Sequence, residues 1–341
     1  MKVYAGMDPA LPLSEVARHA QRIERLGYDG LHVAETVHDS MAVALLALEH
    51  TTTLTVRTAV TLAFVRSPTL LAYQAWDLAQ LSAGRFELGL GTQIRQNIVE
   101  RYGMTWSSPI EQMADYVGAL RSLFESFATG ARLNHHGSHY ELTRLQPYFN
   151  PGPLEAGSPP RLYLGGVGPA SCRLAGAVAN GFITHPTNSN PRYLEEIALP
   201  ELAAGAAGAG RGLSDLEIVV GATVITGADE ERLVAERERQ RRLLAFLYST
   251  PAYRRTLVLY GVEHLEAELK DLIRHDRFDD LGAVLDDDLI DALVPTGTLA
   301  DLPAILLERF AGLAQGILLS VPVDPELDEP LALAIAELQA A

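Results

Sequence analysis

Residues 81–91, LSAGRFELGLG, hold the end of a helix, a turn and a strand within one short stretch. The apolar run that begins at Phe86 is short, ends in glycines and follows a segment of helical period at residues 69–81. A helix followed by a short apolar strand is typical of β-α units, in which helices cover a parallel sheet. We therefore predict an α/β fold with its fourth strand at residues 86–91.

The same alternation continues on both sides of this stretch. Strands are predicted at residues 3–7, 31–34, 56–63, 86–91, 162–165, 181–185, 216–225 and 316–321. Helices are predicted at residues 13–26, 42–49, 69–81, 110–127, 171–179, 193–207, 229–246 and 302–314. In the first helix the apolar residues recur at the i, i+3, i+4, i+7 spacing of a helix with one buried face. Residues 134–160 are rich in Gly and Pro, and we expect a loop there with a short hairpin-like piece at 139–142.

Eight strands in this order match a (β/α)8 TIM barrel in number and spacing. A doubly wound sheet is the alternative, but it would carry a glycine-rich fingerprint after the first strand, and residues 7–12, MDPALP, are not one. Residues 249–294 are predicted to form a helical insertion between strands seven and eight. We expect a single barrel domain over residues 1–341, within which residues 249–294 form an insertion or lid.

The composition excludes several classes of partner and site. The chain has 43 acidic and 27 basic residues and a formal net charge of -16, which argues against nucleic acid or an anionic membrane as a partner. Its single cysteine, Cys172, rules out an intrachain disulfide and a cysteine-cage zinc site and favours a reducing compartment. Since no long apolar run occurs, we expect a cytoplasmic protein. With nucleic acid and membrane disfavoured, we expect it to act on a small molecule.

Three segments resemble the bacterial-luciferase-like superfamily, which includes flavin-dependent monooxygenases and reductases that use the deazaflavin coenzyme F420. They are residues 81–91, residues 26–35 (LGYDGLHVAE) and residues 164–182, which begin with LGGVGP. Residues 92–95 (TQIR) and 249–254 (STPAYR) resemble the actinobacterial deazaflavin-dependent branch. The resemblance covers nearly the whole chain in order, and it implies a TIM barrel, an oxidoreductase activity and a flavin or deazaflavin cofactor.

The turn after strand five is a candidate phosphate site. It follows a strand and opens a helix, so its amide groups can converge on an anion at the positive end of the helix. The pattern alone fits a phosphate site or a tight β-α turn equally well, and the resemblance favours the phosphate site. The expected phosphate-binding residues are Gly165, Gly166, Val167, Gly168 and Pro169.

Two further segments are expected beside the cofactor ring. Strand four ends in Gly89-Leu90-Gly91, where active-site loops of a barrel lie, although glycines there can also serve packing alone. Its polar candidates are Thr92, Gln93, Arg95 and Asn97. By the resemblance, strand three carries a bulge with a non-prolyl cis peptide between Ala59 and Val60, and Ala59, Val60 and Thr61 back the central ring. An ordinary strand is the alternative.

Candidates for proton transfer are Glu35 and His38 after strand two and His185 after strand six. The sugar-phosphate dehydrogenases of this superfamily have an Asp-His pair where this chain has Glu35 and Thr36, and a glutamate where it has Ile94. A sugar-phosphate substrate is therefore not expected.

We expect no metal site, because the loop histidines lack the helical HxxxH spacing of metal ligands. These histidines are His135, His136 and His139.

The resemblance and the candidate residues lead to one leading hypothesis and two rivals. The leading hypothesis is hydride transfer between coenzyme F420 and a small organic substrate. The first rival is a monooxygenase that uses reduced flavin mononucleotide (FMN) and oxygen. The second is a non-catalytic flavin-binding barrel, since a fold alone does not establish turnover. Relatives in the superfamily commonly pair through barrel helices, which suggests a homodimer.

Overall fold

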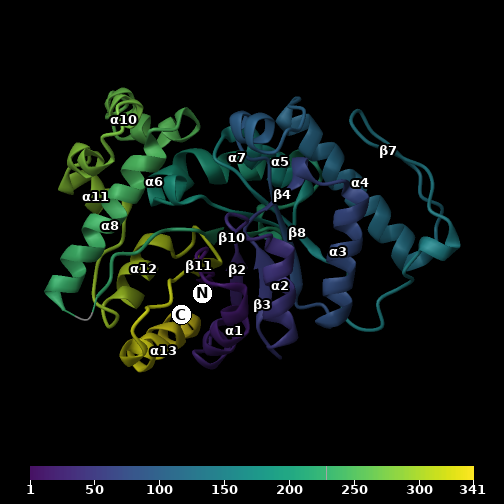
Figure 1. The fold of residues 1–341 in the computed structure, drawn as a ribbon, viewed down its shortest axis with the longest axis horizontal. Coiled ribbons are helices and arrows are strands. Elements are labelled where there is room, and N and C mark those ends of the chain that lie inside the picture. The colour runs from purple at the N-terminus through teal and green to yellow at the C-terminus, as the bar shows by residue number, and fades with distance from the viewer. Residues whose placement is uncertain (228) are drawn as a thin grey trace.

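The computed structural model describes residues 1–227 and 229–341 and contains a closed barrel of parallel strands (Figure 1). The strands pair in the order β3-β2-β1-β11-β10-β9-β8-β5, and β3 also pairs with β5, which closes the sheet. Their bounds are β1 Lys2–Gly6, β2 Gly30–Val33, β3 Thr55–Thr58, β5 Phe86–Gly91, β8 Arg161–Gly165, β9 Gly181–Ile183, β10 Glu217–Val220 and β11 Gly316–Leu318. A short strand, β4 (Thr61–Leu62), continues β3 after a break. The predicted (β/α)8 barrel is confirmed.

Helices surround the barrel (Figure 1). They are α1 Val16–Arg25, α2 Ser40–Glu49, α3 Pro68–Leu81, α4 Pro109–Thr129, α5 Pro169–Val178, α7 Leu199–Gly208, α12 Leu302–Phe310 and α13 Asp328–Ala340. The sequence analysis missed α13, although Leu331, Ile335 and Leu338 of this helix are buried and it packs against α12 and β1. Within the described residues, no helix has both the length and the apolar character needed to span a membrane.

Several predicted elements differ from the structure at their ends. The helix predicted at 193–207 is instead α6 (Pro191–Tyr193), a π-helical turn (Leu194–Ala198) and α7. Pro200 has no amide hydrogen, so an uninterrupted α-helical hydrogen-bond pattern cannot run through this segment. Strands seven and eight end at Val220 and Leu318, earlier than predicted, and the helix predicted at 302–314 ends at Phe310.

A group of helices lies between β10 and α12 and projects from one side of the barrel (Figure 1). It contains α8 (Glu230–Tyr248), α9 (Arg254–Leu259), α10 (Leu265–Arg274) and α11 (Asp287–Leu293), so the helical insertion is confirmed. Its buried apolar residues form a cluster that is separate from the barrel core. The members of this cluster lie between Ile225 and Val294 in the chain. This cluster includes Leu244 and Tyr248, so α8 packs with the insertion although we predicted that the insertion begins after it.

The long loop after α4 is held to that helix by one carboxylate. Its hairpin pairs β6 (His135–His136) with β7 (Glu141–Leu142), so it begins earlier than the predicted 139–142. Asp115 of α4 accepts hydrogen bonds from His135 Nε2 at 2.6 Å and from the amides of His139 and Tyr140 at 2.6 and 2.9 Å. Among the described residues, no group of three or more His, Cys, Asp or Glu side chains could hold a metal ion.

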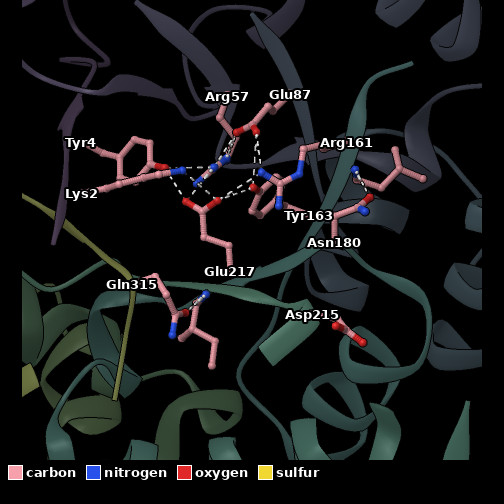
Figure 2. Close-up of polar contacts among 12 residues, drawn as sticks. Lys2, Tyr4, Arg57, Glu87, Arg161, Tyr163, Asn180, Asp215, Glu217 and Gln315 are labelled. Carbon is pink, nitrogen blue, oxygen red and sulfur yellow. Dashed lines mark hydrogen bonds and ion pairs between the residues drawn. The ribbon is translucent and has the colours of Figure 1, made fainter. Parts of the chain in front are cut away.

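Charged and aromatic side chains form a layer inside the barrel, near the amino-terminal ends of the strands. Figure 2 shows these side chains pointing toward one another. The fully buried Arg57 of β3 donates to Glu87 of β5 at 2.7 Å and to Glu217 of β10 at 3.3 Å. Its guanidinium lies 3.7 Å from the ring centroid of Tyr163 on β8 and 4.6 Å from that of Tyr4 on β1. Both tyrosine hydroxyls donate to Glu217. One guanidinium therefore joins five strands through hydrogen bonds and ring contacts.

Glycines on the neighbouring strands make room for the two tyrosine rings. A Cβ atom at Gly30 of β2 would lie 2.9 Å from the ring of Tyr4, and one at Gly316 of β11 would lie 2.7 Å from it. A Cβ atom at Gly181 of β9 would lie 2.2 Å from the ring of Tyr163. Large and small residues thus alternate around the barrel, which lets the layer reach close packing.

Arg85 links several backbone carbonyl groups at the amino-terminal end of the barrel. Its guanidinium donates to the carbonyl oxygens of Leu48 and Thr51 at the end of α2 and to the carbonyl oxygen of Leu54. Carbonyl groups at a helix end lack partners within the helix, so this arginine satisfies them and joins α2 to the start of β5.

Glu217 should make the stability of the barrel dependent on acid. Burial alone raises the pKa of this carboxyl, but the charge of Arg57 and the hydroxyl of Tyr4 outweigh it and lower the pKa from 4.5 to about 2. A lowered folded-state pKa stabilises the protein above pH 4.5, and the stabilisation is lost as the pH falls towards 2. We predict that Glu217→Gln lowers the free energy of unfolding at pH 7 by about 3 kcal/mol.

Urea unfolding at several pH values tests this prediction. The difference in stability between wild type and Glu217→Gln should narrow as the pH falls from 4.5 to 2. The control is Glu337→Gln on the exposed face of α13, which should change stability by less than about 0.5 kcal/mol at any pH. A constant difference between wild type and Glu217→Gln across this pH range would contradict the assignment.

Candidate active site

Three strand ends meet at the carboxyl end of the barrel around Val60. A Cβ atom at Gly91, the last residue of β5, would lie 2.4 Å from Val60 Cγ2. A Cβ atom at Gly165, the last residue of β8, would lie 2.9 Å from Val60 Cγ1. Only glycine therefore fits at these two strand ends while Val60 keeps its position.

The predicted cis peptide between Ala59 and Val60 is present, and it lies at the break between β3 and β4. Ala59 and Val60 are partly exposed, whereas Thr58 before them and Thr61 after them are completely buried. Ala59 and Val60 are thus the part of strand three that is exposed at the mouth of the barrel, and we call this apolar segment the Ala59–Val60 floor. The hydroxyl of Thr61 instead bonds Ser40 of α2 at 2.8 Å, so its side chain faces away from the mouth.

The turn at Gly165–Pro169 is held through its carbonyl groups, which leaves its amides free. Asn188 Nδ2 donates to the Gly166 carbonyl at 3.2 Å, and the Tyr193 hydroxyl donates to the Val167 carbonyl at 2.6 Å. The amides of Gly166, Val167 and Gly168 have no acceptor among the described residues. Because α5 begins at Pro169, these N–H groups lie at the positive end of a helix. The turn fits an anion in both charge and hydrogen-bonding capacity.

Thr92 lies opposite this turn. A small cavity of about 10 Å³ is lined by Thr92, by Leu164 and Gly165 of β8 and by Ser171 of α5, together with Ile110, Met113 and Leu174. The ends of β5 and β8 are thus adjacent, as the predicted cofactor site requires.

The other candidates after β5 extend away from the strand end. Gln93 has a left-handed backbone with φ of 58°, and its side-chain oxygen accepts a hydrogen bond from the Ile94 amide at 2.9 Å. Arg95 is exposed, and Asn97 opens a π-helical turn (Asn97–Arg101).

Glu35 is held in an ion pair. Its carboxylate accepts hydrogen bonds from Arg66 at 2.5 and 2.8 Å and from the amide of Leu62 at 2.7 Å. Arg66 also pairs with Asp39 at 2.6 Å. Both carboxylate oxygens therefore have partners, and Glu35 joins the end of β2 to the end of β4. In this geometry Glu35 is better suited to positioning the Ala59–Val60 floor than to carrying a proton.

His185 follows β9 and lies on the turn that supports the anion-binding loop. Its Nδ1 lies 2.9 Å from the Thr187 hydroxyl, and its own amide donates to Asn188 Oδ1 at 3.0 Å. Asn188 also donates to the Gly166 carbonyl. Burial lowers the pKa of His185 to about 4, so the ring is neutral at pH 7. The third candidate, His38, lies in the half-exposed segment before α2.

Two residues of the insertion, Tyr253 and Arg255, lie near this region, and the sequence analysis predicted neither contact. Tyr253 stacks on His185 with a centroid distance of 4.5 Å and an interplanar angle of 11°. The exposed Arg255 of α9 lowers the pKa of Cys172 and Tyr193 through its charge, although burial raises both pKa values overall. Tyr253 and Arg255 are far from His185 and Cys172 in the sequence, so no local sequence pattern indicates that they lie close to them in the fold.

A larger cavity, of about 600 Å³, lies away from the predicted site residues. It is located where α6, α11 and α12 meet, and three of its lining residues are carboxylates. Its lining residues are Pro191, Glu195, Asp291, Val294, Thr296, Ile305, Glu308 and Arg309. Its one arginine, Arg309, donates to the carbonyl groups of Asp291 and Ala292 and is outnumbered by the three carboxylates, which disfavour an anion, so we place the candidate site at the barrel mouth.

The family model for luciferase-like monooxygenases matches residues 2–314. An uncharacterized protein of Mycobacterium tuberculosis is 36% identical over 314 residues, which cover 92% of each chain. The 5,10-methylenetetrahydromethanopterin reductase of Methanolobus tindarius is 25% identical and covers 95% of each chain.

The fold is also that of a solved enzyme. The coenzyme F420-dependent tetrahydromethanopterin reductase from Methanopyrus kandleri superposes with a TM-score of 0.80 at 18% identity, and the match covers 99% of this chain and 98% of that one. Identity at this level supports the barrel fold and carries no further assignment.

The contact between Val60 and Gly91 can be tested by a double-mutant cycle. We predict that Gly91→Ala lowers the free energy of unfolding by about 1–3 kcal/mol, because the added methyl group meets Val60 Cγ2 at 2.4 Å. Val60→Ala removes that atom, so the double variant should recover most of the loss. Urea unfolding of the four proteins measures the coupling, and simple additivity would show that the two residues do not touch.

Proposed function

The chain belongs to the luciferase-like monooxygenase family, and from that premise we propose that it is an oxidoreductase that transfers a hydride between bound coenzyme F420 and a small organic substrate. The observation that carries this proposal is that two features lie at the same mouth of the barrel. One is the Gly165–Pro169 turn with its free amides, and the other is the apolar Ala59–Val60 segment. The first suits a phosphate group, and the second suits one face of a flat ring.

The residues at the mouth fit a deazaflavin. The amides of Gly166, Val167 and Gly168 would hold its phosphate, with Pro169 at the start of α5. Ala59 and Val60 would lie behind the ring, with Gly165 and Thr92 beside it.

The remaining candidates, Gln93, Arg95 and Asn97, lie on the segment that would border the ring. When bound, the deazaflavin supplies the hydride chemistry, and the protein supplies orientation and electrostatics.

Two observations favour coenzyme F420 over FMN. First, an F420-dependent glucose-6-phosphate dehydrogenase from Nakamurella multipartita is 31% identical to this chain over 169 residues, which are 50% of this chain. In addition, Arg254 pairs with Glu266, whereas its neighbour Arg255 has no ion-pair partner among the described residues. The charge of Arg255 acts on Cys172, which lies in the first turn of α5. A free arginine there suits the longer anionic tail of the deazaflavin.

The substrate is proposed to differ from a sugar phosphate, since Glu35-Thr36 and Ile94 replace the residues that such enzymes carry. His185 is the proposed hydrogen-bonding or proton-transfer group, with His38 as the alternative and Glu35 as a positioning residue. The insertion that includes residues 249–294 would act as a wall or lid over the strand ends.

Subunit association is proposed to involve α2. This helix is apolar on nearly all sides, and Leu45 on it remains 46% exposed. The neighbouring helix α3 exposes Leu70, and the segment before α2 exposes Val37. An apolar helix face left open to water is typical of a protein interface, and a second copy of this chain is the proposed occupant.

The cofactor proposal is tested by substituting Gly168 and measuring binding by titration calorimetry. A Cβ atom at this position meets no other atom within 4 Å, so side chains can be added without a clash. We predict that Gly168→Glu weakens coenzyme F420 at least about tenfold because its carboxylate repels the phosphate, whereas the matched control Gly168→Gln changes affinity much less.

The same titration separates the rival functions. Tighter binding of reduced FMN than of coenzyme F420 would place the chain with the flavin monooxygenases. Coenzyme binding without turnover of any alcohol, aldehyde or activated alkene would favour a non-catalytic barrel. Equal effects of Gly168→Glu and Gly168→Gln would show that the loop holds no anion.

The interface proposal predicts a dimer in sedimentation velocity experiments. Leu45→Glu should shift the protein towards monomer, because it buries a charge in the apolar contact. Leu333→Glu, at a residue of α13 that is 67% exposed, is the matched control and should leave the dimer unchanged. A wild-type monomer at micromolar concentration would refute the interface.

A further inference from the structure

The insertion contacts the His185 turn at two points. The first is the stack of Tyr253 on the imidazole ring, with a centroid distance of 4.5 Å and an interplanar angle of 11°. The second is the Thr187 carbonyl, which accepts hydrogen bonds from the Tyr248 hydroxyl at 2.9 Å and from Thr256 Oγ1 at 2.6 Å. Both donors are buried and come from α8 and α9. The position of His185 therefore depends on helices outside the barrel.

The hydrogen bonds of this turn select one tautomer of the imidazole. Nδ1 accepts a hydrogen bond from the Thr187 amide at 3.4 Å and lies 2.9 Å from the hydroxyl of the same residue. An amide can only donate, so Nδ1 carries no proton, and in a neutral ring the hydrogen must be on Nε2. Nε2 has no hydrogen-bond partner among the described residues. It is left as a donor for a ligand.

The surroundings of the ring keep it neutral. Burial is the cause of its lowered pKa, and no charged side chain contributes to that shift. The titratable group that faces the ring is the phenol of Tyr253, whose own pKa is raised by burial. A neutral imidazole that presents N–H donates a hydrogen bond without bringing a full charge into the site.

We propose that Tyr253 is a positioning residue, through which the insertion holds His185 with Nε2–H aimed as a fixed hydrogen-bond donor for the substrate. The role rests on the proposed function, since it assumes that the mouth of the barrel binds a substrate. The geometry that it requires is a property of the protein alone. Placing a donor before the reaction avoids reorganisation during it, and one such donor contributes about 100-fold or more to kcat.

The test is nitrogen NMR of the full chain without cofactor, with ¹⁵N-labelled histidine and His185→Gln for assignment. Wild type should show the neutral Nε2–H tautomer from pH 5 to 8. Tyr253→Ala should mix the tautomers and move the titration of His185 towards its ordinary range, whereas the conservative control Tyr253→Phe should keep the wild-type spectrum. Thr187→Val removes the hydroxyl but keeps the backbone amide that donates to Nδ1, so it should retain the Nε2–H tautomer.

Kinetics with coenzyme F420 provide the second readout. Tyr253→Ala should lower kcat about tenfold or more with little change in the affinity for coenzyme F420, and Tyr253→Phe should restore it. A wild-type Nδ1–H tautomer, or a Tyr253→Ala spectrum identical to that of wild type, would overturn the proposal. Because the NMR test uses no cofactor, failure of the proposed function and failure of this inference are distinguishable.

Discussion

The buried guanidinium of Arg57 is the interaction on which the barrel depends. A charge in a protein interior is costly unless it is paired and hydrogen-bonded, and here Glu87 and Glu217 supply the pairing. Arg57 and these two partners come from three different strands, so the network forms only when the barrel is closed in the correct register. The rings of Tyr4 and Tyr163 complete the layer, and glycines on the adjacent strands leave space for them.

This polar layer lies towards the amino-terminal ends of the strands and leaves the carboxyl ends to build the site. There the side chains are small, since Gly91 and Gly165 are packed against Val60. Stability and ligand binding are thus assigned to opposite halves of the same strands, as is usual for TIM barrels. The insertion adds a third part, because its helices hold the turn that carries His185.

The sequence predicted the barrel well because its strands and helices are short-range patterns. Residues 86–91 match β5 at both ends, and the cis peptide at Ala59 and Val60 followed from the family resemblance. The stack of Tyr253 on His185 could not be predicted, because it joins residues that are far apart in the chain. The polar layer had a signal that was overlooked: Arg57, Glu87 and Glu217 are charged residues inside predicted strands.

Hydrogen-deuterium exchange with and without coenzyme F420 tests most directly whether the cofactor binds where three strand ends meet. The account predicts slower exchange of the free amides of Gly166, Val167 and Gly168 and of the segments at residues 58–62 and 89–97, with little change in the strands around Arg57. Protection confined to the helices around the 600 Å³ cavity, or no protection at the barrel mouth under saturating cofactor, would contradict it.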